Sequence, residues 1–259
     1  MMKLGNNFAF NKLKNESINI EFNYECATTQ GVCFKTGILL GITFLTSLFM
    51  LAIILKTGSF SLFLYLIVGI VATVLQIIIN INPLKAKSLA IPYAISEGLV
   101  ISCLCGLVEL AFPGNGLVIS GLALLITLSI FLAAVFLYSK RIITVGFRFR
   151  SFLLIAGLGV IVFSVFFSLL AVALFFINGM NLYSVFYFSG LGVVVSLFMC
   201  LLASMYVIYS LSVADNLISS GVEKTMEWYA AYAITLNVIY LYIEILRLLI
   251  ILFGRRNNN

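Results

Sequence analysis

The sequence predicts an all-α fold, a polytopic membrane protein built as a seven-transmembrane-helix bundle, and three observations lead to this prediction. Hydrophobic residues make up 63% of the 259 residues and charged residues only 9%, whereas a soluble domain carries roughly 25% charged residues. The apolar residues are gathered into long runs, and most charges stand between the runs. This composition excludes an ordinary soluble enzyme, a disordered protein and a nucleic-acid-binding protein.

Each apolar run is long enough to cross a bilayer, because a spanning helix needs about 20 mostly apolar residues. The runs lack the inside–outside alternation of a membrane β-barrel, so they are expected to be helices. Glycine, proline and charged residues between the runs supply the turns. The predicted spans are Thr36–Leu55, Ser59–Ile81, Leu89–Phe112, Leu117–Tyr138, Phe152–Ile177, Phe186–Val213 and Tyr229–Phe253.

The spans divide the chain into a polar N-terminal arm (residues 1–35), a transmembrane domain (residues 36–253) and a short polar tail (residues 254–259). Lysine and arginine are distributed unequally between the two ends of the predicted bundle. Eleven lie on the side of the N-terminal arm and three on the other side. Because positive residues collect in cytoplasmic loops, we expect a cytoplasmic N-terminus and, after seven spans, a C-terminus on the opposite side.

The sequence contains no histidine. Its absence excludes Ser-His-Asp and Cys-His nucleophiles, histidine proton relays and histidine-ligated metals. An aspartyl intramembrane protease needs two catalytic aspartates, and Asp215 is the only aspartate in the chain. We therefore expect no enzymatic activity and no bound cofactor.

Four charged residues within the predicted spans, or at the end of one, are candidates for function, because a charge at mid-bilayer is costly. Glu97 lies in the third span and Asp215 follows the sixth. Glu244 and Arg247 lie in the seventh, where Asn237 and Tyr240 precede them at helical spacing. These four side chains of the seventh span share one helix face, which is expected to point into the bundle or a wet cavity.

Two interpretations of this polar face are open. In the first, Glu244 and Arg247 pair at i,i+3 spacing and neutralise each other. In the second, Asp215 approaches Glu244 from the neighbouring span, and the two carboxyl groups share one proton and titrate as a coupled pair. When deprotonated, Asp215 and Glu244 would offer oxygen ligands for a transiently bound calcium ion.

Several segments resemble the Bax inhibitor-1 (YccA-like) membrane protein family, most closely its bacterial branch. The most specific match is the C-terminal stretch from Met226-Glu-Trp-Tyr-Ala-Ala-Tyr to Leu241-Tyr-Ile-Glu-Ile-Leu-Arg-Leu-Leu249. Weaker matches follow the family's order along the chain. They are Asn7-Phe-Ala-Phe-Asn11, Lys35-Thr-Gly-Ile-Leu-Leu40, Tyr93-Ala-Ile-Ser-Glu-Gly98, Phe112-Pro-Gly114, Leu137-Tyr-Ser-Lys140 and Phe147-Arg-Phe-Arg150.

The resemblance implies a seven-helix fold in the cell membrane with the last helix near the centre of the bundle. It also implies a pH-dependent cation leak, chiefly of calcium, in which Asp215 and Glu244 form the pH-sensing pair. Glu97 and Arg247 are then expected to line or latch the path. Glutamate at position 244 departs from the aspartate of the better-studied branch. The alternative function is a non-conducting regulator of a membrane protease or another membrane partner, contacted through residues 1–35.

Overall fold

The computed structural model describes residues 25–57, 62–140, 142, 145–179, 182 and 190–257, and this part of the chain is almost entirely helical. It contains seven α-helices and one short 3-10 helix. Their bounds are α2 Thr29–Thr57, α3 Leu62–Ile81, η1 Pro83–Lys85, α4 Ala86–Ala111, α5 Gly116–Ser139, α6 Phe147–Asn178, α8 Gly190–Ser219 and α9 Met226–Asn257. Six α-helices are long and apolar enough to cross a membrane, and α3 holds a shorter apolar stretch. The predicted all-α membrane bundle is confirmed.

Two helices, α2 and α9, extend beyond their predicted apolar runs at both ends. Helix α2 begins at Thr29, within the segment expected to be a polar arm, and α9 continues to Asn257. Helix ends are set by backbone hydrogen bonds, so a helix can extend past its apolar stretch into polar sequence. The expected start of the sixth span at Phe186 and the first 24 residues of the arm lie outside the described residues.

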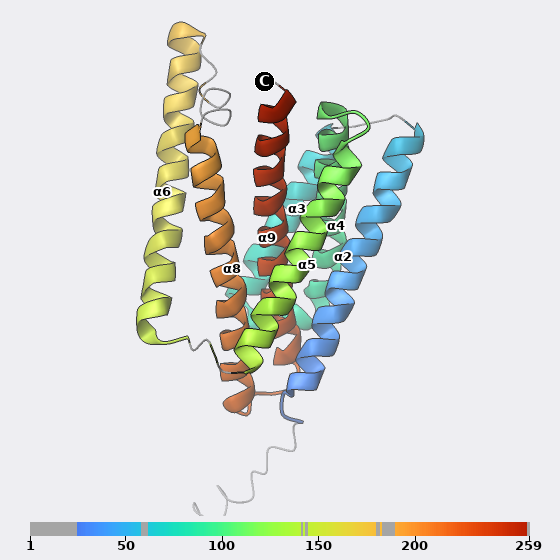
Figure 1. The fold of residues 1–259 in the computed structure, drawn as a ribbon. Coiled ribbons are helices and arrows are strands. Elements are labelled where there is room, and N and C mark those ends of the chain that lie inside the picture. The colour runs from blue at the N-terminus through green and yellow to red at the C-terminus, as the bar shows by residue number, and fades with distance from the viewer. Residues whose placement is uncertain are drawn as a thin grey trace, which may run out of the picture.

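Helix α9 occupies the centre of the bundle (Figure 1) and packs against α2, α4, α5 and α8. Helix α6 lies at the edge and packs chiefly against α8. The burial of the two helices reflects these positions: 44% of the apolar stretch of α9 is buried inside the protein, but only 6% of that of α6. The central position of the last helix is the arrangement that the sequence resemblance implies.

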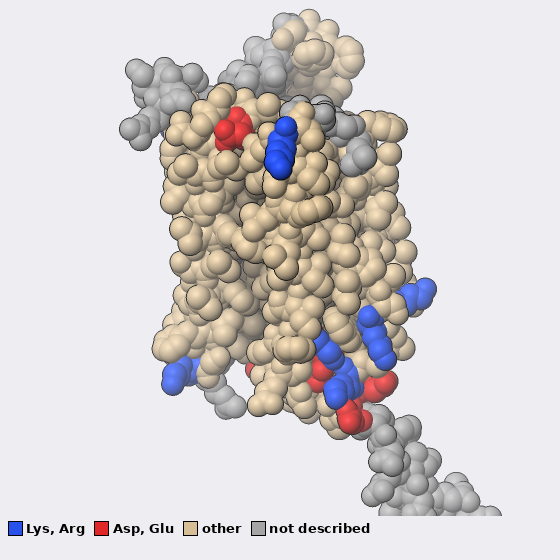
Figure 2. Space-filling view, turned by 90° about the vertical axis from the view of Figure 1, so that its right-hand side faces the viewer, with Lys and Arg blue, Asp and Glu red and all other residues tan. Residues whose placement is uncertain are grey.

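The two ends of the bundle carry different parts of the chain. The start of α2 and the connection from α8 to α9 lie at one end, and the C-terminal end of α9 lies at the other (Figure 1). Gly221 provides the turn between α8 and α9 with a φ of 64°, a left-handed conformation that favours glycine. On the face shown in Figure 2, charged side chains gather toward the two ends and leave an uncharged band between them.

Glu109, near the end of α4, has a local structural role. Its carboxylate accepts hydrogen bonds from the backbone N–H groups of Gly114 and Leu117, each at 2.8 Å. These donors belong to the turn after α4 and to the first turn of α5, where helical N–H groups lack a partner within the helix. Glu109 therefore caps α5.

Candidate functional site

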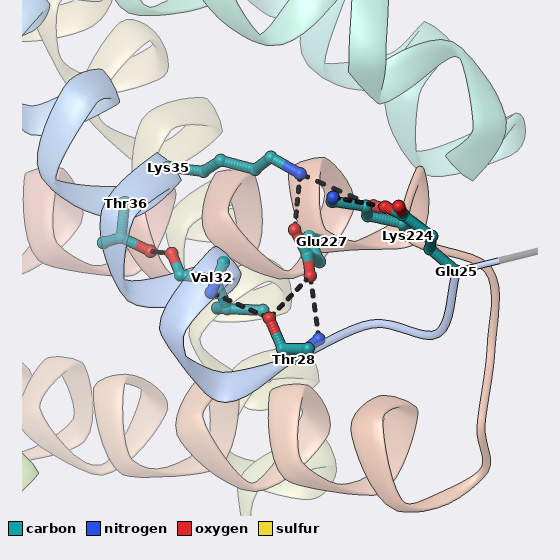
Figure 3. A network of polar contacts seen from close by, with 8 residues as sticks. Glu25, Thr28, Val32, Lys35, Thr36, Lys224 and Glu227 are labelled. Atoms are coloured by element: carbon teal, nitrogen blue, oxygen red, sulfur yellow. Dashed lines mark hydrogen bonds and ion pairs between the residues drawn. The ribbon is translucent and has the colours of Figure 1, made fainter.

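The most completely bonded charged side chain in the described bundle is Glu227, in the first turn of α9. Its carboxylate is fully buried. It accepts hydrogen bonds from the Thr28 backbone N–H at 2.8 Å, the Thr28 hydroxyl at 3.0 Å and the Lys35 ammonium at 2.6 Å (Figure 3). Gly31 faces this carboxylate so closely that a Cβ there would collide with it. We call Thr28, Gly31, Lys35 and Glu227 the α2–α9 clamp.

A second ion pair and two backbone hydrogen bonds extend the clamp toward the end of the bundle. The Lys224 ammonium donates to the Glu25 carboxylate, and both side chains are exposed (Figure 3). The Lys224 N–H donates to the Glu25 carbonyl, and the Ala27 N–H donates to the Val222 carbonyl, each at 2.8 Å. Through these contacts residues 25–28, directly before α2, are held against the loop between α8 and α9.

The Glu25–Lys224 pair shifts the pKa of both groups in the direction that keeps them charged. The hydrogen bond from Lys224 lowers the pKa of the Glu25 carboxyl below its ordinary value of 4.5. The same bond raises the pKa of Lys224 above its ordinary value of 10.5. Both groups are fully exposed, so solvent screens the pair.

Glu244 lies deep within α9 and pairs with Arg247. Only 2% of the Glu244 side chain is exposed, and Arg247 Nη1 donates to its Oε2 at 3.2 Å. The Arg247 side chain is 40% exposed. Tyr240, one turn earlier on α9, and Cys200 of α8 also lie beside the carboxylate. The structure thus forms the i,i+3 pair of the first interpretation.

Asp215 stands apart from this group. It is exposed near the end of α8, beside Tyr138 of α5. The α8 residue beside Glu244 is Cys200, which precedes Asp215 by fifteen residues. At 1.5 Å per residue, this spacing corresponds to about 22 Å along the helix. The structure therefore does not bring Asp215 and Glu244 together, and they do not form a shared calcium site in this conformation.

A cavity of about 480 Å³, lined by both polar and apolar side chains, lies between α3, α4, α6, α8 and α9. Glu97 and Tyr93 of α4 line it, and Asn237 and Tyr240 contribute from the predicted polar face of α9. The Tyr93 side chain lies beside the Glu97 carboxyl. Arg247 lines a neighbouring cavity of about 570 Å³ between α6 and α8. Val160 of α6 borders both cavities.

The two cavities lie next to the weakly packed helix α6. Tyr206 of α8 anchors this helix by donating a hydrogen bond to the Leu153 carbonyl at 2.9 Å. Gly157 leaves room for the Tyr206 hydroxyl, because a Cβ at that position would collide with it. The predicted site residues are thus divided: Glu97, Glu244 and Arg247 lie in or beside the cavities, and Asp215 lies elsewhere.

A family model described as Bax inhibitor 1 like matches residues 6–254, which is nearly the whole chain. The chain belongs to this family. Comparison with curated proteins and with solved structures gives no match. The cavity, the buried carboxyl groups and the central α9 are therefore features of a Bax inhibitor 1 like membrane protein.

The described residues of this Bax inhibitor 1 like protein contain no group of three or more His, Cys, Asp or Glu side chains placed to hold a metal ion. The acids near the cavities are single carboxyl groups, each beside a tyrosine hydroxyl. Such an arrangement offers a passing cation one carboxylate at a time.

Glu227 is a buried charged residue that the sequence analysis did not single out. Its partners Thr28 and Lys35 precede it by 199 and 192 residues. No local sequence pattern predicts a contact between residues so far apart in the chain. The sequence signal that was available is an acidic residue directly after the predicted turn and a basic residue at the predicted entry to the first span.

Proposed function

We propose that this protein is a pH-sensitive cation leak of the cell membrane that passes calcium and has its N-terminus in the cytoplasm. The single observation that carries the proposal is the cavity to which Glu97, Asn237 and Tyr240 contribute polar side chains within an otherwise apolar bundle. Ionisable groups at membrane depth mark ion and proton pathways, because their placement there is costly. A carboxylate in such a cavity attracts cations and supplies hard oxygen ligands to calcium.

Glu244 and Arg247 belong to the polar face of α9, and Arg247 lines the second cavity. We assign this pair the role of a latch. When paired, Glu244 neutralises Arg247, whose positive charge otherwise opposes a cation in the neighbouring cavity. Protonation of Glu244 would remove that neutralisation, and protonation of Glu97 would remove the charge that attracts cations. Both changes oppose cation passage at acidic pH, so the leak is expected to rise with pH.

Asp215 takes a different role in this proposal from the one predicted from the sequence. It lies near the cytoplasmic end of α8 in the proposed orientation and is exposed. A carboxylate there gathers cations at the end of the bundle without sharing a proton with Glu244. Its neutralisation should lower the amplitude of the leak and leave the pH dependence in place.

Calcium influx into proteoliposomes tests the proposal. Purified protein is reconstituted with an internal calcium dye, and influx is recorded from about pH 6 to pH 8, a range into which burial away from water can raise the titration of a carboxyl group. Wild type should show influx that rises with pH. In Glu97→Gln and in Glu244→Gln the influx should rise less steeply with pH than in wild type. In Asp215→Asn the influx should be lower by the same factor at every pH.

Empty liposomes and proteoliposomes of a folded, unrelated membrane protein provide the background. Influx that equals this background at every pH, with folding confirmed, would contradict the leak. The alternative, a non-conducting regulator of a membrane protease or another membrane partner, would then be the better interpretation. Influx that is present but independent of pH in wild type would contradict the sensing roles of Glu97 and Glu244.

A further inference from the structure

A separate cavity of about 450 Å³ runs between α2 and α5, with α4 and α9 behind it. Phe44 and Leu48 of α2 and Leu117 of α5 line its mouth, and each is 43–48% exposed on the membrane-facing surface. Gly41 and Gly121 line the cavity and have no side chains to fill it, and an added Cβ at either position would meet open space. The cavity is therefore a groove that faces the lipid, and we call it the α2–α5 groove.

The groove has the depth of one bilayer leaflet. It extends along α2 from Leu40 to Leu51 and along α5 from Leu117 to Leu128. Helix α2 is the first α-helix of the described bundle and α5 the fourth, so they cross the membrane in opposite directions. Leu51 and Leu117 therefore belong to one end of the groove and Leu40 and Leu128 to the other. Eleven steps of 1.5 Å give about 16 Å, against about 15 Å for half of a 30 Å hydrocarbon core.

A hydroxyl with an unused hydrogen bond lines the groove near its outer end. Ser120 is 93% buried, since 7% of it is exposed. Its Oγ makes no hydrogen bond of good geometry among the described residues, and the Tyr242 hydroxyl lies beside it. Other polar groups of the groove are paired: Thr127 donates to the Ala123 carbonyl at 2.7 Å, and Tyr242 pairs with the Cys105 thiol at 3.3 Å. A buried hydroxyl without a well-aligned partner is unfavourable, so an acceptor brought by a ligand would be stabilising.

Ser120 lies about one helical turn inside α5, which begins at Gly116. At this depth a phospholipid places its ester carbonyls, and the acyl chain below them extends toward the bilayer centre. We propose that the α2–α5 groove binds one acyl chain of a bilayer phospholipid. The Ser120 hydroxyl donates to the ester carbonyl, and the chain runs toward Leu40 and Leu128.

Photocrosslinking with two lipids determines both occupancy and direction. Full-length protein is reconstituted into bilayers that contain a phospholipid with a diazirine either next to the ester or at the end of the acyl chain. Peptides are identified by mass spectrometry after irradiation. We expect the ester-proximal probe to label the Leu51 and Leu117 ends of α2 and α5, and the chain-terminal probe to label the Leu40 and Leu128 ends.

Three variants separate groove binding from general contact with lipid. Gly41→Leu fills the groove and should reduce labelling by both probes about tenfold. Gly37→Leu, the same substitution one turn earlier on α2, is the matched control, because a Cβ there also meets open space and Gly37 does not line the groove. Ser120→Ala should reduce ester-proximal labelling by about two- to tenfold, the value of one hydrogen bond of about 0.5–1.5 kcal/mol.

Labelling that is uniform over the outward faces of α2, α5 and α6, and equal in Gly41→Leu and Gly37→Leu, would overturn the proposal. Labelling of the groove in the reverse order by the two probes would overturn the assigned direction and the role of Ser120. Absence of lipid labelling in the groove together with labelling elsewhere would also overturn it and would favour a protein segment as the occupant. These outcomes do not depend on whether the protein conducts cations.

Discussion

Two glutamates on α9 are buried to almost the same extent but have very different surroundings. Glu227, at 0% exposure, accepts two hydrogen bonds from Thr28 and forms an ion pair with Lys35. Glu244, at 2% exposure, has a single cationic partner, Arg247, which is itself partly exposed. The first carboxylate is fixed by three donor groups of Thr28 and Lys35, at the start of α2. The second is contacted by Arg247 and Tyr240 of its own helix.

This comparison indicates how a charge that stabilises a membrane bundle can be distinguished from one that serves its function. Both carboxylates are buried, so burial alone does not distinguish them. Glu227 ties the start of α2 to the start of α9 at one end of the bundle. Glu244 instead neighbours Tyr240 and Arg247, which line the two cavities. We therefore expect loss of Glu227 to affect stability and loss of Glu244 to affect transport.

The largest effect is expected for Glu227→Gln. This substitution removes a buried negative charge and leaves the Lys35 ammonium without its ion-pair partner. Breaking a buried pair by removing one partner costs about 3–5 kcal/mol. Thermal unfolding of the detergent-solubilised protein should show a clear loss of stability, with Lys224→Gln as the control from the exposed pair. Equal stability of Glu227→Gln and wild type would contradict the clamp.

A smaller loss is expected for Gly31→Ala, which tests the same clamp from the α2 side. The added Cβ collides with the Glu227 carboxylate, and such overpacking typically costs about 1–3 kcal/mol. Gly37→Ala in the same helix meets open space and should be neutral or stabilising by up to about 1 kcal/mol, the difference in helix propensity. If the same unfolding measurement gave both variants one value, the close approach of α2 and α9 at Gly31 would be wrong.

Glu244→Gln should change stability less than Glu227→Gln does. The substitution leaves Arg247 without its ion-pair partner. The Arg247 side chain is 40% exposed and lines the second cavity, so its charge is not fully buried. We expect a cost of about 1 kcal/mol or less, as for a partly exposed pair. A loss as large as that of Glu227→Gln would show that Glu244 is also a structural anchor.

The smallest effect is expected for the exposed Glu25–Lys224 pair. The pKa of Glu25 is lowered by Lys224, so the contribution of this carboxylate is present at neutral pH and is lost as pH falls through the lowered value. The pKa of Lys224 is raised, so its contribution is lost only as pH rises through a value above 10.5. The stability difference between wild type and Lys224→Gln should therefore be small and constant from pH 6 to pH 8. A difference that changes within that window would assign part of the pH response to this pair.

The sequence was sufficient for the spans and for the local pairing on α9. Long apolar runs predict helices because lipid leaves the backbone no other partners, and i,i+3 spacing places Glu244 beside Arg247. The resemblance also implied the central place of the last helix. It did not reveal the α2–α9 clamp, because contacts between residues almost 200 positions apart depend on how the helices pack.

The predicted Asp215–Glu244 contact shows the same limit. The two residues lie on adjacent helices, but contact requires equal depth as well as adjacency. Asp215 is four residues from the end of α8, whereas Glu244 is eighteen residues into α9. At the depth of Glu244, the nearby residue of α8 is Cys200 and not an acidic residue. Whether Asp215 and Glu244 meet depends on the register of α8 against α9, which the sequence alone left open.

The most direct test of the assignment of Glu244 to transport measures two properties of Glu244→Gln in one preparation. Thermal stability is recorded first, and calcium influx into proteoliposomes from pH 6 to pH 8 is then recorded beside wild type. We expect stability close to that of wild type and an influx that is lower and rises less steeply with pH, because Glu97 still titrates. A folded Glu244→Gln protein with the influx and pH profile of wild type would contradict that assignment.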